Sequence, residues 1–304
     1  MDADVRLRAL DPVRDRPLLA RLWETALGPV WPLLPGALDI VRDGIVAQAR
    51  RSGPGGPGGG ALGVVAVDPA GSIPLLLVDP DHQRRGIATR LVEAGLARLA
   101  ALGAAAVKLG SGGDDYIWPG VPDDLPAAAG FFAARGWRLD DTVLDLTADL
   151  RGYAPPAGAG ERPARAGVSF RVMADRERPE VLAFEAATFP SWLGWFERLG
   201  ASVLVARDGR GAAVGTLLFR GPPGATIYGP LLGPDAGTIG CVGVAEAARG
   251  AGVGSAMVAR ASELLRDAGT GACHIGWTQR ERFYSRLGYR PWRGYHMARR
   301  ALPR

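Results

Sequence analysis

The chain has 304 residues, the length of two average domains, and 47% of them are apolar, which is enough for buried cores. No apolar run approaches the roughly 18 to 20 residues of a membrane span, and the acidic residues 1–4 lack the apolar stretch of a signal peptide. Two cysteines exclude a disulfide framework. We therefore expect a cytoplasmic protein without a membrane partner. The net charge of +5 rests on arginine, because Lys108 is the only lysine, and no basic run interleaved with aromatics indicates a nucleic-acid partner.

The first half of the chain predicts strands and helices on both sides of a glycine-rich turn. Apolar periodicity predicts strands at residues 5–10, 45–49, 62–67, 73–78 and 105–109, and helices at residues 15–26, 89–102 and 127–134. The turn, residues 83–88, follows one strand and opens the next helix. A run of glycine and proline at residues 53–60 separates two strands, and we interpret it as a hairpin loop.

The second half repeats this order after a segment dense in Pro, Gly and Ala at residues 151–163. Strands are expected at residues 168–172, 203–206, 213–219, 238–244, 272–277 and from Tyr289 onward, and helices at residues 177–188, 255–267 and 280–287. The second turn spans residues 249–254. The sequence therefore predicts a duplicated α+β fold, each copy a mixed sheet flanked by helices, with domains at 1–150 and 168–304 joined by a linker at 151–167.

Both turns have the composition of a phosphate-binding loop. They read Gln83-Arg84-Arg85-Gly86-Ile87-Ala88 and Arg249-Gly250-Ala251-Gly252-Val253-Gly254. The first turn of a helix has N–H groups without intrahelical partners and lies at the positive end of the helix dipole. Glycine there lets the backbone approach a pyrophosphate that a Cβ would block.

These residues resemble the GNAT N-acetyltransferase superfamily, in which an Arg/Gln-x-x-Gly-x-Gly/Ala turn after a central strand holds the pyrophosphate of acetyl-CoA. Each turn is also followed by an aromatic pair and then a Gly-aromatic, which are Phe131-Phe132 with Gly136-Trp137 and Phe283-Tyr284 with Gly288-Tyr289. The resemblance covers nearly the whole chain and implies two tandem GNAT domains. A Rossmann fold is disfavoured, because its glycines follow the first strand, whereas these turns come late in each half.

The resemblance implies which residues bind acetyl-CoA, the acyl donor. In the first half these are Val78, Gln83, Arg84, Arg85, Gly86, Ile87 and Ala88. In the second half they are Val242, Val244, Arg249, Gly250, Ala251, Gly252, Val253, Gly254 and Ser255. A backbone N–H of Val242 or Val244 is also expected to face the thioester oxygen, where such a donor acts as an oxyanion hole.

The aromatic pairs distinguish the two halves. In the family, a tyrosine of this pair protonates the departing CoA thiolate, and Tyr284 has this position, whereas the first half has Phe132. We therefore predict a catalytic second domain and a catalytically degenerate first domain, whose turn can still bind CoA. The alternative for Tyr284 is a core aromatic. The first half also carries 14 extra residues, placed at residues 111–124, which form either a solvated loop or a wall that receives a cationic substrate.

The sequence does not identify the general base, for which the candidates are Glu185, Glu197, His274 and a water relay. Cys241 and Cys273 are interpreted as buried hydrophobes, and the three dispersed histidines predict no metal site. The predicted reaction is acetyl transfer by direct attack of a primary amine of a small molecule, such as an amino sugar, an aminoglycoside or an amino-acid-like metabolite. The alternatives are an acyl-CoA sensor without turnover and an acetyltransferase of protein amines. The aromatic residues 189–199 either line the acceptor pocket or pack between domains. The oligomeric state is not indicated.

Overall fold

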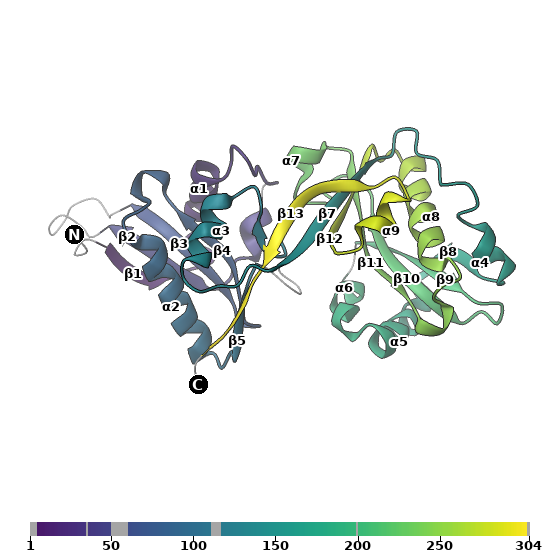
Figure 1. Cartoon of the computed structure of the whole chain (residues 1–304), viewed down its shortest axis with the longest axis horizontal. Helices are drawn as coiled ribbons and strands as arrows, with labels where there is room; N and C mark the ends of the chain where they lie inside the picture. The colour runs from purple at the N-terminus through teal and green to yellow at the C-terminus, as the bar shows by residue number, and fades with distance from the viewer. Residues whose placement is uncertain (1–4, 35, 50–59, 111–116, 199, 303–304) are drawn as a thin grey trace. The chain divides into compact units, whose positions relative to one another are not determined.

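The computed structural model describes residues 5–34, 36–49, 60–110, 117–198 and 200–302. The chain divides into two compact units (Figure 1). The first unit contains residues 1–142 and 295–304, and the second contains residues 143–294. The division differs from the predicted boundaries, because residues 143–150 belong to the second unit and the last ten residues belong to the first.

The first unit has a mixed sheet with the strand order β1-β2-β3-β4-β5-β14. The strands of this sheet are β1 (Val5–Ala9), β2 (Gly44–Ala49), β3 (Ala61–Asp68), β4 (Ser72–Val78), β5 (Ala106–Leu109) and β14 (Arg299–Ala301). The short strand β6 (Val121–Pro122) pairs with β13 (Arg290–Met297) instead. The helices of the first unit are α1 (Arg16–Ala26), α2 (Ile87–Ala101) and α3 (Pro126–Ala133), with short 3-10 helices at Ala37–Ile40 and Pro80–His82. β4 and β5 are parallel, and the other pairs in this sheet are antiparallel.

The second unit has a mixed sheet in which β7-β12-β11-β10-β9-β8 are neighbours in that order, with β13 beside β7. Its strands are β7 (Asp141–Asp149), β8 (Ser169–Val172), β9 (Ser202–Arg207), β10 (Ala213–Arg220), β11 (Ala236–Val244), β12 (Ala272–Thr278) and β13 (Arg290–Met297). The first two residues of β7 and the last three of β13 fall within the first unit. The helices of the second unit are α4 (Glu161–Arg165), α5 (Arg178–Thr188), α6 (Leu193–Glu197), α7 (Gly229–Leu232), α8 (Val253–Asp267) and α9 (Glu281–Ser285), with 3-10 helices at Asp175–Glu177, Pro190–Trp192 and Glu246–Ala248.

Helices pack against both sheets. In the first unit, α2 and α3 pack on one face through an apolar cluster that includes Leu91, Leu99 and Phe132. In the second unit, α8 and α9 pack on one face through Met257 and Leu265, and α5 and α6 pack on the other around Val181 and Phe196. The duplicated α+β fold, with two mixed sheets flanked by helices, is confirmed.

The ends of the two predicted domains and the linker predicted between them form regular structure. β7, which the sequence did not predict, pairs with β12 in the second unit, and β14 completes the sheet of the first unit beside β5. Within residues 151–167, Tyr153 is buried in the core of the second unit, and α4 forms with Pro163 buried. The predicted hairpin loop at residues 53–60 lies almost entirely outside the described residues, but β2 and β3 on either side of it are antiparallel neighbours.

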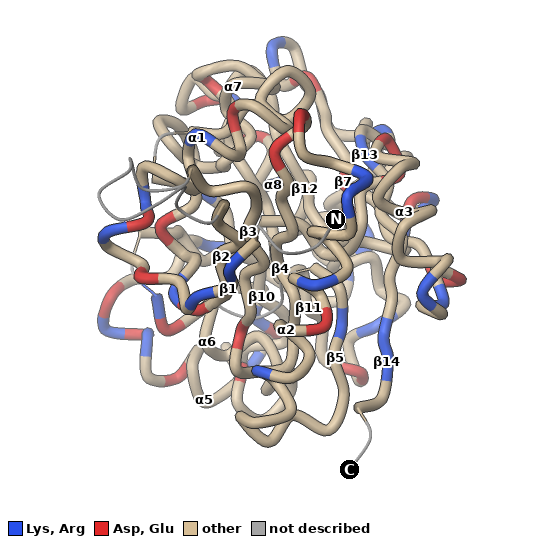
Figure 2. Tube along the Cα trace, turned by 90° about the vertical axis from the view of Figure 1, so that its left-hand side faces the viewer, with Lys and Arg blue, Asp and Glu red and all other residues tan. Residues whose placement is uncertain are grey.

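Charged residues of both signs are interspersed along the trace rather than gathered by sign (Figure 2). Over the residues that the structure describes, no helix is long and apolar enough to cross a membrane.

Candidate active site

The two glycine-rich turns have the same backbone conformation. Gly250 and Gly252 of the second turn have φ of 81° and 82°, and Arg84 and Gly86 of the first turn, 166 residues earlier, have φ of 61° and 81°. Gly86 and Gly252 are the N-caps of α2 and α8, each 15 residues long. Each turn therefore presents backbone N–H groups at the positive end of a long helix, which is a site for an anion such as a diphosphate.

The same side-chain contact stabilises each turn. Gln83 Nε2 donates to the carbonyl oxygen of Val78 (3.2 Å), and Arg249 Nε donates to that of Val244 (3.1 Å). Ile87 and Val253, the first helical residues, anchor the helices with buried side chains. The structure thus brings each predicted donor-binding set together, with the remaining residues of both turns exposed or half-buried.

The parallel strands that precede each turn separate at equivalent positions. β4 pairs with β5 only as far as Ile73 and Leu109, and β11 pairs with β12 only as far as Ile239 and Ile275. Beyond these pairs the strands diverge toward the turn. A gap of this kind between two strands leaves backbone N–H and C=O groups for a ligand that carries amides of its own.

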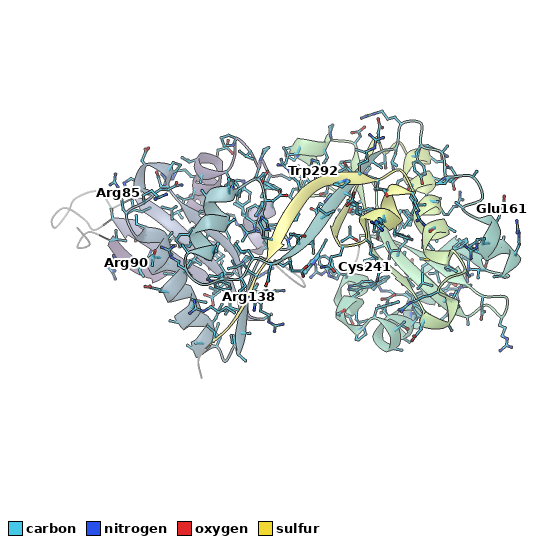
Figure 3. All side chains as sticks on the ribbon, viewed as in Figure 1. Arg85, Arg90, Arg138, Glu161, Cys241 and Trp292 are labelled. Carbon is cyan, nitrogen blue, oxygen red and sulfur yellow. The ribbon has the colours of Figure 1, made fainter. Side chains whose placement is uncertain are left out.

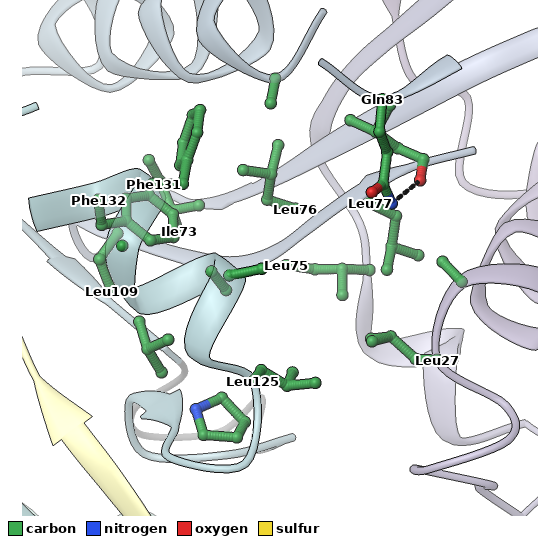
Figure 4. A pocket seen from close by; sticks show the side chains of 18 of the residues that line it. Leu27, Ile73, Leu75, Leu76, Leu77, Gln83, Leu109, Leu125, Phe131 and Phe132 are labelled. Carbon is green, nitrogen blue, oxygen red and sulfur yellow. Dashed lines mark hydrogen bonds between the residues drawn. The ribbon is translucent and has the colours of Figure 1, made fainter. Parts of the chain in front are cut away.

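In the first unit the gap opens into a cavity of about 970 Å³. It extends from Gln83 in the turn along β4 to Leu125 and Leu27 (Figure 4). Phe131 and Phe132 form one wall. This volume is at the upper end of the range for small-molecule sites, about 300 to 1,000 Å³.

In the second unit both diverging strands contain a bulge. Cys241 and Val242 on β11 lie opposite Leu217 alone, and Gly276 and Trp277 on β12 lie opposite Asp145 alone. Cys241 and Trp277 have φ of 49° and 53°. Apart from Arg84, they are the only non-glycine residues with positive φ in the described parts of the chain. Such strain costs about 1 to 3 kcal/mol for each residue and is concentrated at functional sites.

Glu185 is fully buried beside the bulge of β11. Thr216 Oγ1 donates a hydrogen bond to Glu185 Oε1, and Oε2 has no partner among the described residues. Burial raises the pKa of Glu185 to about 7. Burial, with a smaller contribution from the charge of Glu185, raises the pKa of the nearby Cys241 thiol to about 12. The carboxyl therefore titrates near neutral pH, while Cys241 stays a thiol.

Tyr284 lies at the other side of the same bulge. It is 7% exposed and packs edge to face against Phe283, with ring centroids 4.8 Å apart. Burial raises the pKa of Tyr284 to about 12, with a smaller opposing effect from Arg280, and Cys241 is close enough to contribute to the increase. The phenol therefore keeps its proton at neutral pH. We call Glu185, Thr216, Cys241 and Tyr284 the polar cluster; Figure 3 labels Cys241.

The equivalent positions of the first unit are all apolar. α1 and α5 have 11 residues each and begin with Arg-Pro, so that Trp23 corresponds to Glu185. Val64 on β3 pairs with Leu77 on β4 as Thr216 on β10 pairs with Gly243 on β11, so that Val64 corresponds to Thr216. We call this set, all buried, the apolar counterpart: Trp23, Val64, Leu75 and Phe132.

The other candidate bases have different surroundings. His274 is buried, and its Nε2 donates to Asp145 Oδ2 (3.0 Å), whose other oxygen accepts the N–H of Trp277 (2.8 Å). Glu197 is exposed on α6. Cys273 is fully buried, and burial raises the pKa of its thiol to about 12. The described residues hold no group of three or more His, Cys, Asp or Glu side chains suited to a metal ion.

The sequence did not decide the role of two segments that contain aromatic residues, residues 189–199 and the extra segment at residues 111–124. Phe189 packs inside the second unit, where its ring fills the space beside Gly243 and stacks on Trp192. In the extra segment of the first half, residues 111–116 lie outside the described residues. Trp118 is buried against Trp23 and Trp31, at centroid distances of 5.3 and 5.5 Å, and we call these three residues the tryptophan cluster.

Sequence reasoning missed Thr216 and the role of α4. Arg162 Nη2 donates to the carbonyl oxygen of Gly250 (2.9 Å), and Pro163 lies 3.6 Å from where a Cβ of Gly252 would be. The supposed linker therefore stabilises the second turn from outside.

Two family models match the chain, one in each unit. "Acetyltransferase (GNAT) domain" matches residues 194–291, and "Acetyltransferase (GNAT) family" matches residues 51–116. Mycothiol acetyltransferase of Clavibacter sepedonicus is 30% identical over 223 residues, which are 68% of this chain and 64% of that protein. The chain thus spans slightly less than two thirds of that relative.

Solved structures match over nearly the whole chain. A GCN5-related glucosamine N-acetyltransferase region of a fungal multi-domain GH3 β-N-acetylglucosaminidase has a TM-score of 0.88 at 28% identity, over 99% of this chain and 38% of that chain. A tandem GNAT protein from the clavulanic acid biosynthesis pathway has a TM-score of 0.67 at 17% identity, over 99% of this chain and all of the other, and so shares the fold.

Proposed function

Because the chain belongs to the GNAT acetyltransferase family and carries two GNAT domains in tandem, we propose that it transfers an acetyl group from acetyl-CoA to a primary amine of a small molecule. We assign the chemistry to the second unit. The observation that carries this assignment is the polar cluster around the bulge of β11, which the first unit replaces with its apolar counterpart.

The residues of the second unit fit the acyl donor as a substrate. Residues 249–255 offer backbone N–H groups to the diphosphate at the start of α8. The unpaired edge of β11 beyond Ile239 offers hydrogen bonds to the amides of the pantetheine arm. The thioester then lies near the bulge, where we assign the backbone N–H of Val242 to the developing oxyanion.

Acid–base chemistry follows from the polar cluster. The attacking amine nitrogen bonds to the thioester carbon and loses a proton to Glu185, directly or through a water molecule, because a carboxylate with a pKa of about 7 is half ionised at neutral pH. The carbon–sulfur bond breaks, and Tyr284 gives its proton to the departing thiolate. Proton exchange with solvent restores both groups.

For the acceptor we propose an amino sugar. The fungal region, named as a glucosamine N-acetyltransferase, shares 28% identity over 99% of this chain. A primary amine on a sugar is one of the acceptor classes that the sequence left open, and glucosamine is the first compound to test.

For the first unit we propose binding of CoA without turnover. Its turn has the same conformation as the second turn, its cavity adjoins that turn, and Phe132 has no proton to give. This assigns the two activities that the sequence suggested, catalysis and acyl-CoA sensing, to different units.

Release of CoA thiol from acetyl-CoA in the presence of glucosamine and a panel of other amines tests the proposal. A matched pair of variants assigns the site: Ser255→Glu and Thr89→Glu each place a carboxylate in the first turn of the helix that should hold the diphosphate. We expect Ser255→Glu to abolish thiol release and Thr89→Glu to leave it within about twofold. If Thr89→Glu were the inactive variant, the chemistry would belong to the first unit.

A further inference from the structure

The cavity of the first unit has two chemically different ends. One end is the first turn, where Gly86 caps α2 and where Gln83 and Arg84 line the cavity. Arg85 and Arg90 lie close by in sequence and are labelled in Figure 3. Backbone N–H groups, a helix N-terminus and arginines together suit the phosphates of CoA.

The other end is apolar. The side chains that line it come from β4, β5, the end of α1 and the start and body of α3, and they include Leu27, Leu75, Leu109, Leu125 and Phe132 (Figure 4). Asp124 is the only carboxylate among the described lining residues, and it accepts the indole N–H of Trp31 (3.1 Å). His82 also lines the cavity, but it lies next to the first turn, so none of the described residues at the apolar end corresponds to the buried carboxyl of Glu185.

The tryptophan cluster occupies the position where the second unit has its buried carboxyl. Trp23 replaces Glu185, and Trp118 stacks on Trp23 and donates its indole N–H to the carbonyl oxygen of Pro74 on β4 (3.1 Å). Beyond the point where β4 and β5 separate, a thioester would therefore meet hydrocarbon side chains and the indole ring of Trp118. A polar acceptor would lose hydration there without gaining hydrogen bonds.

We propose that the first unit binds an acyl-CoA whose acyl group is longer than acetyl, with the acyl chain in this apolar end, and that it holds this thioester without transferring it. The inference rests on the proposed binding of CoA by the first unit. It adds the chemical class of the acyl group, which the apolar lining between Leu75 and Leu125 selects.

Calorimetric titration of the Ser255→Glu protein with CoA, acetyl-CoA, butyryl-CoA and hexanoyl-CoA tests the proposal, because this variant leaves only the first site. Each buried methylene contributes about 0.8 kcal/mol, or about fourfold in affinity. Allowing for incomplete burial, we expect the affinity for hexanoyl-CoA to exceed that for acetyl-CoA by about tenfold or more. We expect no release of thiol when amines are added. Equal affinities along the series, or thiol release, would overturn the proposal.

Variants of Leu125 locate the acyl chain. Leu125 is half-buried, lines the cavity and lies seven residues before Phe132, as Trp277 lies seven residues before Tyr284. We expect Leu125→Trp to reduce hexanoyl-CoA binding to the level of acetyl-CoA, and Leu125→Met to keep the preference. An unchanged preference in Leu125→Trp would overturn the assignment of this end.

The two proposals fail separately. If no CoA compound binds the Ser255→Glu protein while the wild type still acetylates an amine, the inference fails and the proposed activity stands. If CoA compounds bind neither unit of the wild type and no thiol is released, the proposed function itself fails.

Discussion

The two units have nearly the same backbone around the turn and differ in the side chains just beyond it. Both turns combine two positive φ angles with a 15-residue helix, and both strand pairs separate at equivalent residues, Ile73 and Ile239. Around that point the second unit has the polar cluster and two bulges with a positive-φ residue in each, whereas the first has the apolar counterpart and a bulge in β4 without such a residue. Under the proposed function, the shared backbone binds a CoA ester in both units, and the differing side chains decide which unit transfers the acyl group.

Burial of the polar cluster is itself informative. An unpaired carboxyl oxygen in an apolar core destabilises a fold, and a hydrophobic residue of similar size would remove that cost. At the position of Glu185 the first unit has a larger aromatic residue, Trp23, whose indole N–H is satisfied by the carbonyl oxygen of Trp31. The second unit therefore carries a destabilising group that its sister domain lacks, which is typical of a group kept for function.

The largest effect is expected at Tyr284. Replacing it with phenylalanine keeps the ring packed against Phe283 and removes only the hydroxyl, so the second unit would match the first at this position. Loss of a general acid lowers the rate by about 10²- to 10⁴-fold. We expect this loss in the kcat for CoA release from acetyl-CoA, with acetyl-CoA affinity unchanged by calorimetry. As a control, Phe132→Tyr should not restore activity to the Tyr284→Phe protein, and restoration would place the chemistry in the first unit.

A second prediction concerns Glu185 and pH. Because a base must be ionised to act and burial raises the pKa of Glu185 to about 7, kcat/KM should rise with pH and level off above about 7. Tyr284, with a pKa of about 12, should cause no loss of activity at moderately alkaline pH. Glu185→Gln should lower kcat by about 10²-fold and remove the acid limb of the profile. A variant that keeps this limb would exclude Glu185 as the base.

Stability provides the control for that variant. The folded protein holds the Glu185 proton up to a pH of about 7, whereas an unfolded chain releases it near its ordinary pKa of 4.5. The free energy of unfolding therefore falls by about 3 kcal/mol as pH rises between these values, and glutamine escapes this loss. Glu185→Gln should thus be more stable than the wild type at pH 8 and similar near pH 4, measured by urea unfolding. A variant that is both inactive and less stable at pH 8 would indicate a structural role alone.

The turns, the strands before them and the helices after them could be predicted because each is a local pattern. Two glycines at fixed spacing and apolar residues at helical spacing determine that part of the fold. The unequal aromatic pairs, Phe132 and Tyr284, were also visible in the sequence. So was Glu185 as a candidate base, although the signals for Glu197 and His274 were no weaker.

Non-local features could not be predicted. In the sequence of β7, Asp145 interrupts the alternation of apolar and polar residues. Its carboxylate is buried because His274 and the N–H of Trp277 form hydrogen bonds with it, and both partners are distant in sequence. Thr216 carries no signal on its own, because its partner Glu185 lies 31 residues away. The segment that includes α4 was read as a linker from its composition, and its contacts with the second turn depend on tertiary structure.

The smallest predicted effect concerns that segment and distinguishes the two turns. In the first turn Arg85 donates to the backbone carbonyl oxygen of Asp81 just before the loop (3.0 Å), whereas in the second turn Arg162 donates to that of Gly250 from α4. One such hydrogen bond contributes about 1 kcal/mol, so Arg162→Ala should raise the KM for acetyl-CoA about fivefold and leave kcat unchanged. Arg165→Ala, on the same helix but paired with Glu161 (2.8 Å), is the matched control and should have no effect. If both variants raised KM equally, the effect would come from the positive charge of α4 and not from the hydrogen bond between Arg162 and the turn. The proposed difference between the two turns would then be wrong.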